Sequence, residues 1–112
     1  MIAPEIVEKV KELRPSTQHK DDILLDWIYR VDKKIREEIH GESDEEFEVL
    51  ELAVPEEYSD IYVYFVIANL HFYNGEYDKY SNVITQYNTL LDEYAKKYIR
   101  EHRPSSNGVK VW

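Results

Sequence analysis

The stretch Tyr62–Tyr80, YVYFVIANLHFYNGEYDKY, decides the fold, because its first part predicts a helix that is buried on every side. Nearly all of that part is apolar or aromatic, in a chain of 112 residues with a formal net charge of −9. A surface helix keeps a polar side, whereas a helix that is apolar all round lies in a core. Asn74-Gly75 then predicts a turn, since glycine readily takes the left-handed conformation that ends a helix.

A seven-residue repeat follows this turn. Its members are Tyr77, Tyr80, Ile84, Tyr87, Leu91, Tyr94 and Tyr98. The spacing predicts a helix from about Glu76 to His102, roughly 40 Å long, with one seam that faces a partner helix. Because the connection is short, the partner is expected to be the preceding helix, in an antiparallel hairpin.

Two amphipathic helices are expected before the buried one. The first covers about 4–13 and ends before Pro15, because the residue before a proline avoids the helical conformation. The second covers about 18–40, with Ser16 or Thr17 as its cap. Its apolar stripe comprises Ile23, Leu24, Trp27, Ile28, Val31, Ile35 and Ile39. The polar residues expected to face water are Asp26, Arg30, Asp32, Lys33, Arg36 and Glu37.

The segment 42–54 has the least regular pattern, and it predicts either a short strand around 47–52 or an extended connection. Pro55 favours a first helical turn, so the third helix is expected to start there. The expected fold class is mainly α, a single bundle of about four helices over 1–103. Residues 104–112, rich in turn-forming residues, are expected to form a flexible tail.

The buried helix has more apolar surface than one neighbour can cover. Residues expected to meet the last helix are Tyr62, Phe65, Asn69 and Phe72 or Tyr73. Those expected to meet the second helix, at Trp27, are Val63, Ile67 and Leu70. Tyr64 and His71 remain, and they are predicted to contact a partner.

The charge pattern limits the kinds of partner that the chain can bind. The chain has 23 acidic against 14 basic side chains, which argues against a broad phosphate-binding face. Glu45, Glu46 and Glu48 belong to an acidic run that is either a solvated loop, a docking surface or a channel lining. Basic residues gather at 96–103, so a chain that is polar from end to end could assemble head to tail or side to side. The longest near-apolar run, 61–73, is shorter than the roughly 20 residues of a membrane helix, so no membrane partner is expected.

No catalytic constellation is recognisable. The four histidines are never paired at the i, i+4 spacing of a helical zinc site, and a Glu-x-x-His pattern occurs once, at Glu37 and His40. There is no cysteine and no glycine-rich phosphate loop. The sequence therefore predicts a protein that is not an enzyme and that needs no cofactor and no metal.

The last four residues, Val109, Lys110, Val111 and Trp112, alternate between apolar and polar as a strand does. Two readings stay open for them. Trp112 either folds back on its own domain, or the segment adds a strand to the sheet edge of a partner.

Two segments carry a resemblance to a known family. VEKVKELRP at 7–15, with the following LDWI at 25–28, resembles the opening of tailed-phage head–tail connector proteins. Residues 61–104, with NGEYDKY at 74–80 and the exit YIREHRP at 98–104, are similar to the C-terminal hairpin of connector-like proteins from phages and prophages of Gram-positive hosts.

The resemblance implies a structural virion protein of the phage neck, present in the host cytoplasm during assembly. It implies a homo-oligomeric ring, commonly dodecameric, that binds the portal protein, extends the DNA channel without specific DNA binding, and receives the tail or a stopper protein. Family members contact the portal partly through C-terminal segments, which would give 109–112 an anchoring role. An acidic channel lining would let DNA slide without sticking.

An alternative is a helical adaptor that binds proteins. YNGEYDK at 73–79 resembles the middle of a tetratricopeptide unit, although Tyr80 stands where that pattern wants a small residue. No second 34-residue copy is present, and about three are needed for a stable stack. This reading predicts a monomer that binds a peptide in a groove.

Overall fold

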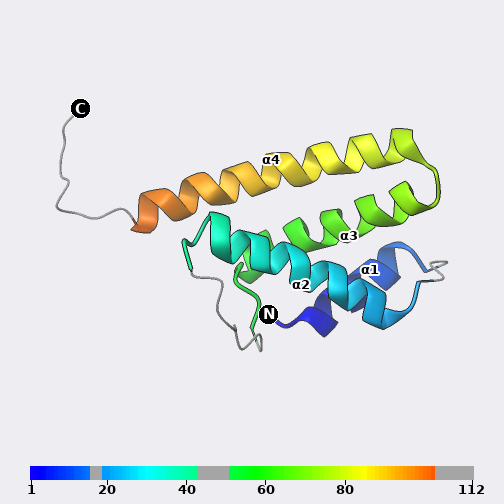
Figure 1. Ribbon diagram of the computed structural model, residues 1–112, viewed down its shortest axis with the longest axis horizontal. Coiled ribbons are helices and arrows are strands. Elements are labelled where there is room, and N and C mark those ends of the chain that lie inside the picture. Colours follow the sequence, from blue (N-terminus) through cyan, green and yellow to red (C-terminus); the bar gives the residue numbers. More distant parts are fainter. Residues whose placement is uncertain (16–18, 43–50, 103–112) are drawn as a thin grey trace.

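The computed structural model describes residues 1–15, 19–42 and 51–102, and these residues form four α-helices (Figure 1). The helices are α1 (Ala3–Leu13), α2 (Asp21–Glu38), α3 (Asp60–Tyr73) and α4 (Tyr77–His102), with a 3-10 turn, η1, at Glu56–Tyr58. No strand occurs within the described residues. The predicted mainly α architecture is confirmed.

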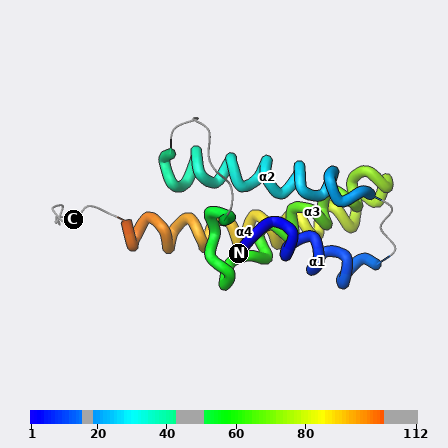
Figure 2. The backbone as a smooth tube through the Cα atoms, turned by 90° about the horizontal axis from the view of Figure 1, so that it is seen from below, coloured from blue at the N-terminus to red at the C-terminus, as the bar shows by residue number. Residues whose placement is uncertain are grey.

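Helix α3 is the central element of the bundle. It packs antiparallel to α4 on one side, and α1 and α2 cover its other side (Figures 1 and 2). Its buried residues are Ile61, Tyr62, Val63, Val66, Ile67, Ala68, Leu70 and His71. Burial from two sides explains why this helix lacks a polar face.

The turn between α3 and α4 depends on Gly75, whose φ is +75°. The amide of Gly75 donates to the carbonyl of Phe72 at 3.1 Å, and the amide of Glu76 donates to that of His71 at 2.9 Å. This pair of bonds is the Schellman motif, which needs a left-handed residue at its centre. The sequence predicted this ending correctly.

The middle of the α4 seam packs as the repeat predicts, whereas Tyr77 at its start is exposed. Tyr87 and Tyr94 are buried, and the ring of Phe65 lies 5.4 Å from that of Tyr87. Tyr62 faces elsewhere than expected, since it donates a hydrogen bond to Asp32 of α2. Of the two alternatives Phe72 and Tyr73, Phe72 meets α4 through Tyr77 and Tyr80, and Tyr73 stacks on Trp27 of α2.

Two helix starts differ from the prediction. Helix α2 begins at Asp21, preceded by Lys20 at the cap position, and the proposed caps Ser16 and Thr17 lie outside the described residues. Pro55 opens the 3-10 turn, and α3 begins only at Asp60. Pro55 takes the extended conformation of a cap residue (φ −67°, ψ 162°), and the turn that follows it, Glu56–Tyr58, is 3-10 rather than α.

The predicted short strand is not formed where it can be seen. Glu51 and Leu52 belong to no strand, although the amide of Leu52 donates to the carbonyl of Met1 at 2.9 Å. The rest of the proposed strand, 47–50, lies outside the described residues, as does the proposed tail from 104.

Candidate functional site

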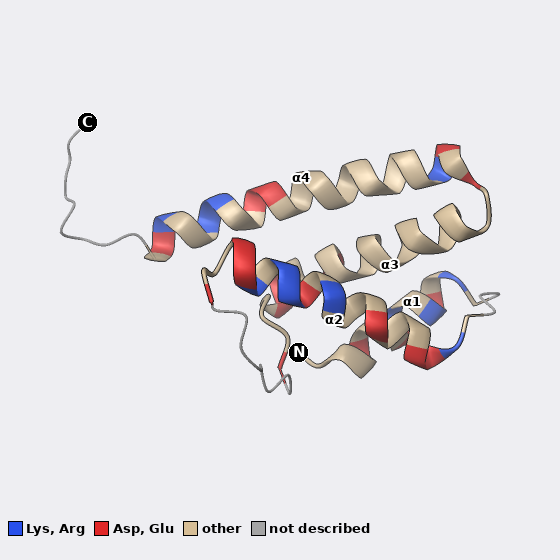
Figure 3. Ribbon diagram, viewed as in Figure 1, with Lys and Arg blue, Asp and Glu red and all other residues tan. Residues whose placement is uncertain are grey.

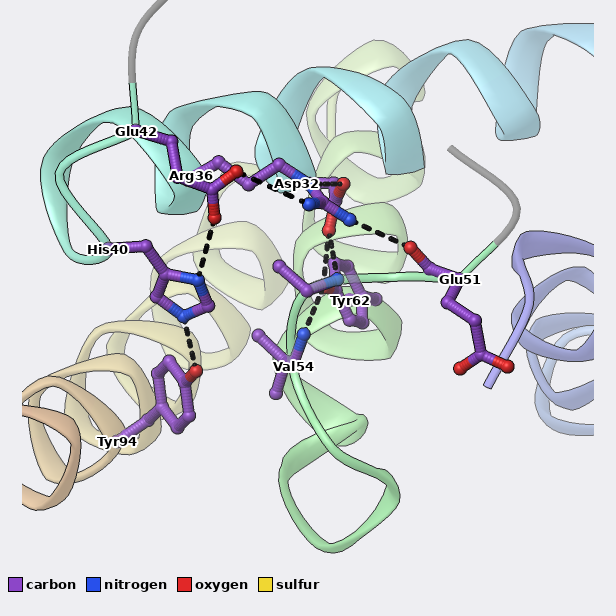
Figure 4. A network of polar contacts seen from close by, with 9 residues as sticks. Asp32, Arg36, His40, Glu42, Glu51, Val54, Tyr62 and Tyr94 are labelled. Atoms are coloured by element: carbon purple, nitrogen blue, oxygen red, sulfur yellow. Dashed lines mark hydrogen bonds and ion pairs between the residues drawn. The ribbon is translucent and has the colours of Figure 1, made fainter. Parts of the chain in front are cut away.

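A buried carboxylate, Asp32 of α2, is the centre of a polar network (Figure 4). Its side chain is only 2% exposed, and its Oδ2 accepts from Nε of Arg36 at 2.8 Å. Its Oδ1 accepts from the hydroxyl of Tyr62 at 2.7 Å and from the amide of Ala53 at 2.8 Å. A buried charge is costly unless it is paired and hydrogen-bonded in this way.

The network fastens the chain between α2 and α3. The amide of Val54 donates to the hydroxyl of Tyr62 at 3.1 Å, and Nη2 of Arg36 donates to the carbonyl of Glu51 at 2.7 Å. Burial and the charge of Asp32 raise the pKa of Tyr62, so the hydroxyl keeps its proton and remains a donor. These contacts fix the segment 51–54, which has no regular secondary structure of its own.

A second branch joins the end of α2 to α4. Nδ1 of His40 donates to the carboxylate of Glu42 at 3.3 Å, because a carboxylate can only accept. Nε2 of His40 then accepts from the hydroxyl of Tyr94 at 2.6 Å (Figure 4). Burial raises the pKa of Tyr94 to about 12. The rings of His40 and His102 stack on the two sides of Tyr98, at 4.1 Å and 3.8 Å.

Asp32 was predicted to face water, and that prediction is wrong. The residue follows Ile28 by four positions and precedes Ile35 by three, and both isoleucines are buried. Positions three and four apart share one face of a helix, so the spacing placed Asp32 on the apolar stripe. This signal was present in the sequence and was missed.

A second feature is an exposed aromatic surface at the end of the molecule where α3 turns into α4. This hairpin-end surface consists of His19, Phe72, Tyr73 and Tyr77, and the buried Trp27 supports it from below. Trp27 and Tyr73 stack nearly parallel, with centroids 5.6 Å apart, and Phe72 contacts both Tyr73 and Tyr77. Phe72, Tyr73 and Tyr77 are 47%, 65% and 60% exposed. Contiguous apolar side chains that stay this exposed mark an interaction site more often than scattered ones.

A groove of about 1130 Å³ lies beside this surface. Its charged lining consists of Arg14, Lys20, Lys79, Asp22 and Glu76. The imidazole of His71 lies at its wall, where Nε2 is 3.4 Å from Nη2 of Arg14 and Nδ1 is 2.9 Å from Oε1 of Glu76. Arginine can only donate, so Nε2 accepts and the proton of the neutral ring is on Nδ1, pointing to Glu76.

The hydrogen bond from His71 lowers the pKa of Glu76, and the charge of Lys79 adds to the effect. A lowered pKa favours the folded state above the ordinary value of 4.5, and this contribution is lost as the pH falls through the lowered pKa. We expect His71→Ala to move the pKa of Glu76 most of the way back, and Lys79→Gln to move it less. Carboxyl ¹³C NMR across pH 2–7 measures both shifts, and equal shifts would contradict the leading role of His71.

The predicted partner-binding residues lie in different places. His71 is 7% exposed and makes the contacts just described, and Tyr64 is half-buried and packs against the core. Both residues therefore have contacts within the chain, and their contact with another protein stays a prediction. The remaining members of the predicted set, Val109, Lys110, Val111 and Trp112 with Glu45, Glu46 and Glu48, lie outside the described residues.

The fold does not place the basic residues of α4 and the start of the acidic run at opposite ends of the molecule. The last turns of α4 lie at the same end as Glu42, where the acidic run begins, and Tyr94 and Tyr98 contact His40 there (Figure 3). Lys97 pairs with Glu57 at 2.9 Å, and Lys96 with Asp92 at 2.9 Å. Glu42, the part of the acidic run that lies within the described residues, is thus at the basic end of α4 and not opposite it.

No protein-family model matches the chain, and neither a curated protein nor a solved structure shows significant similarity to it. Among the described residues, no cluster of three or more histidine or acidic side chains has a geometry that could hold a metal ion. None of the described helices combines the length and the apolar character needed to cross a membrane.

Proposed function

We propose that the chain is a structural subunit of a tailed-phage neck, which assembles as a ring beneath the portal and connects the head to the tail. One observation carries the proposal: the segment whose sequence is similar to the connector hairpin, 61–104, contains the antiparallel pair α3–α4. Within the part of the chain that the structure describes, the hairpin also has the most exposed aromatic surface, at Phe72, Tyr73 and Tyr77. A ring subunit needs exposed surface of this kind for its neighbours.

The portal is the partner that tests this function. The purified chain, alone and mixed with the portal protein encoded in the same genome, is measured by light scattering and by negative-stain microscopy. We expect a discrete ring that is bound to the portal, and either the same ring or a monomer in its absence. A chain that remains a monomer and ignores the portal would exclude a neck subunit and leave the helical adaptor as the better explanation.

A further inference from the structure

The groove at the hairpin end is more cationic than the rest of this acidic molecule. Arg14, Lys20 and Lys79 contribute three positive charges, and Asp22 and Glu76 two negative ones. Within the described residues, Arg14 bonds to a carbonyl and to His71 and forms no ion pair, and Lys20 forms none either. In a chain of net charge −9, a cationic groove beside exposed aromatic rings fits an occupant that is both acidic and apolar.

The chain itself contains a segment of this composition. Residues 42–50 read ESDEEFEVL, in which five carboxylates surround Phe47, Val49 and Leu50. We infer that the groove and the hairpin-end surface of one copy bind segment 43–50 of a second copy. The carboxylates would face Arg14 and Lys20, and Phe47 would pack among the exposed rings of the hairpin end.

The backbone of the segment falls short of the groove of its own molecule. Both of its anchors lie at Arg36: the amide of Glu42 donates to the Arg36 carbonyl at 2.8 Å, and Nη2 of Arg36 donates to the Glu51 carbonyl at 2.7 Å. Nine extended steps span about 30 Å, so a loop that leaves and returns reaches about 15 Å. Lys20 precedes Arg36 by sixteen residues of the α2 region, which is about 24 Å along a helix.

The contact is therefore heterologous, since each copy would carry the groove near the start of α2 and the segment that follows α2 in the chain. Repeating such a contact gives a closed ring or an open filament. The inference deepens the proposed ring, and it depends on that proposal for closure and for the portal, but not for the contact itself.

A labelled peptide tests the contact directly. The probe is fluorescein-labelled ESDEEFEVLEL, residues 42–52, titrated with the full chain and followed by fluorescence anisotropy at low salt. We expect saturable binding that weakens as salt is raised, because the contact is partly ionic. A peptide with every Glu and Asp replaced by Gln and Asn, and one with Phe47→Ala, should each bind at least tenfold more weakly.

Variants of the chain locate the site. Lys20→Glu and Tyr73→Ser change exposed side chains, and each should weaken binding of the wild-type peptide at least tenfold. Lys34→Glu, the same charge change on the far part of α2, is the control and should bind as the wild type does. Binding that is equal in all three variants, or no binding by the wild type, would overturn the inference.

Self-association of the whole chain gives a second readout. Lys20→Glu alone and Glu46→Lys alone should each lower the weight-average mass in sedimentation, and the double variant should recover part of it. A double variant no better than the single ones would contradict the pairing. If the chain binds the peptide but not the portal, the contact between copies is supported and the neck function is excluded. If a portal-bound ring forms and Lys20→Glu does not affect it, the neck function is supported and the contact is excluded.

Discussion

Replacing Asp32 with alanine should destabilise the fold by about 3–5 kcal/mol, the cost of breaking a buried ion pair. The change removes the acceptor of three donors, on Arg36, Tyr62 and Ala53, and leaves them without their partner in a buried region. Small domains are stable by only about 5–15 kcal/mol, so the loss is a large share of the total. Thermal unfolding by circular dichroism should show a fall in Tm of more than about 10 °C.

The same helix offers a matched control. Asp26 and Arg30 form an ion pair at the same i, i+4 spacing and the same 2.8 Å, but their side chains are 54% and 73% exposed. Exposed pairs of this kind contribute at most about 1 kcal/mol, so Asp26→Ala should change Tm only slightly. If both alanine variants lost the same stability, burial would not be what makes the Asp32 pair important.

Local patterns in the sequence were enough to predict the helices and the α3–α4 hairpin. Gly75 ends α3 because the left-handed conformation is a property of one residue, and the repeat from Tyr77 to Tyr98 needs only the period of a helix. Pro55 led to a wrong prediction of where α3 starts, because the preference of proline for a first helical turn takes no account of contacts with distant residues. The extended conformation that it takes instead is supported by Tyr62, which binds the amide of Val54 eight residues earlier.

The candidate sites depend on contacts between distant parts of the chain. Trp27 and Tyr73 are far apart in sequence and stack only because α2 and α3 are neighbours. Arg14 and His71 likewise meet only because the end of α1 lies beside α3. Each residue alone has an ordinary explanation, as a core aromatic or the end of a helix, so the pattern of one segment could not reveal the groove. Asp32 could be predicted in part: its spacing in the sequence places it on the buried face of α2, but the sequence does not show which groups bind it.

Replacing Tyr62 with phenylalanine should cost about 2–4 kcal/mol, although the substitution removes a single oxygen. That hydroxyl donates to Oδ1 of Asp32 at 2.7 Å and accepts from the amide of Val54 at 3.1 Å. Without it the Val54 amide loses its acceptor, and the Asp32 carboxylate loses one of its donors. Chemical denaturation should show a lower midpoint with an unchanged m-value, since the surface exposed on unfolding is nearly the same.

Tyr87→Phe is the matched substitution with the opposite expectation. The hydroxyl of Tyr87 is buried and has no hydrogen-bond partner among the described residues, and burial raises its pKa to about 12. Removing a buried polar group that bonds to nothing should leave stability unchanged or raise it by about 1 kcal/mol. Both rings come from the stretches that predicted the hairpin, and both are buried. A similar loss in the two variants would mean that packing around the ring, rather than the partners of the oxygen, determines the cost.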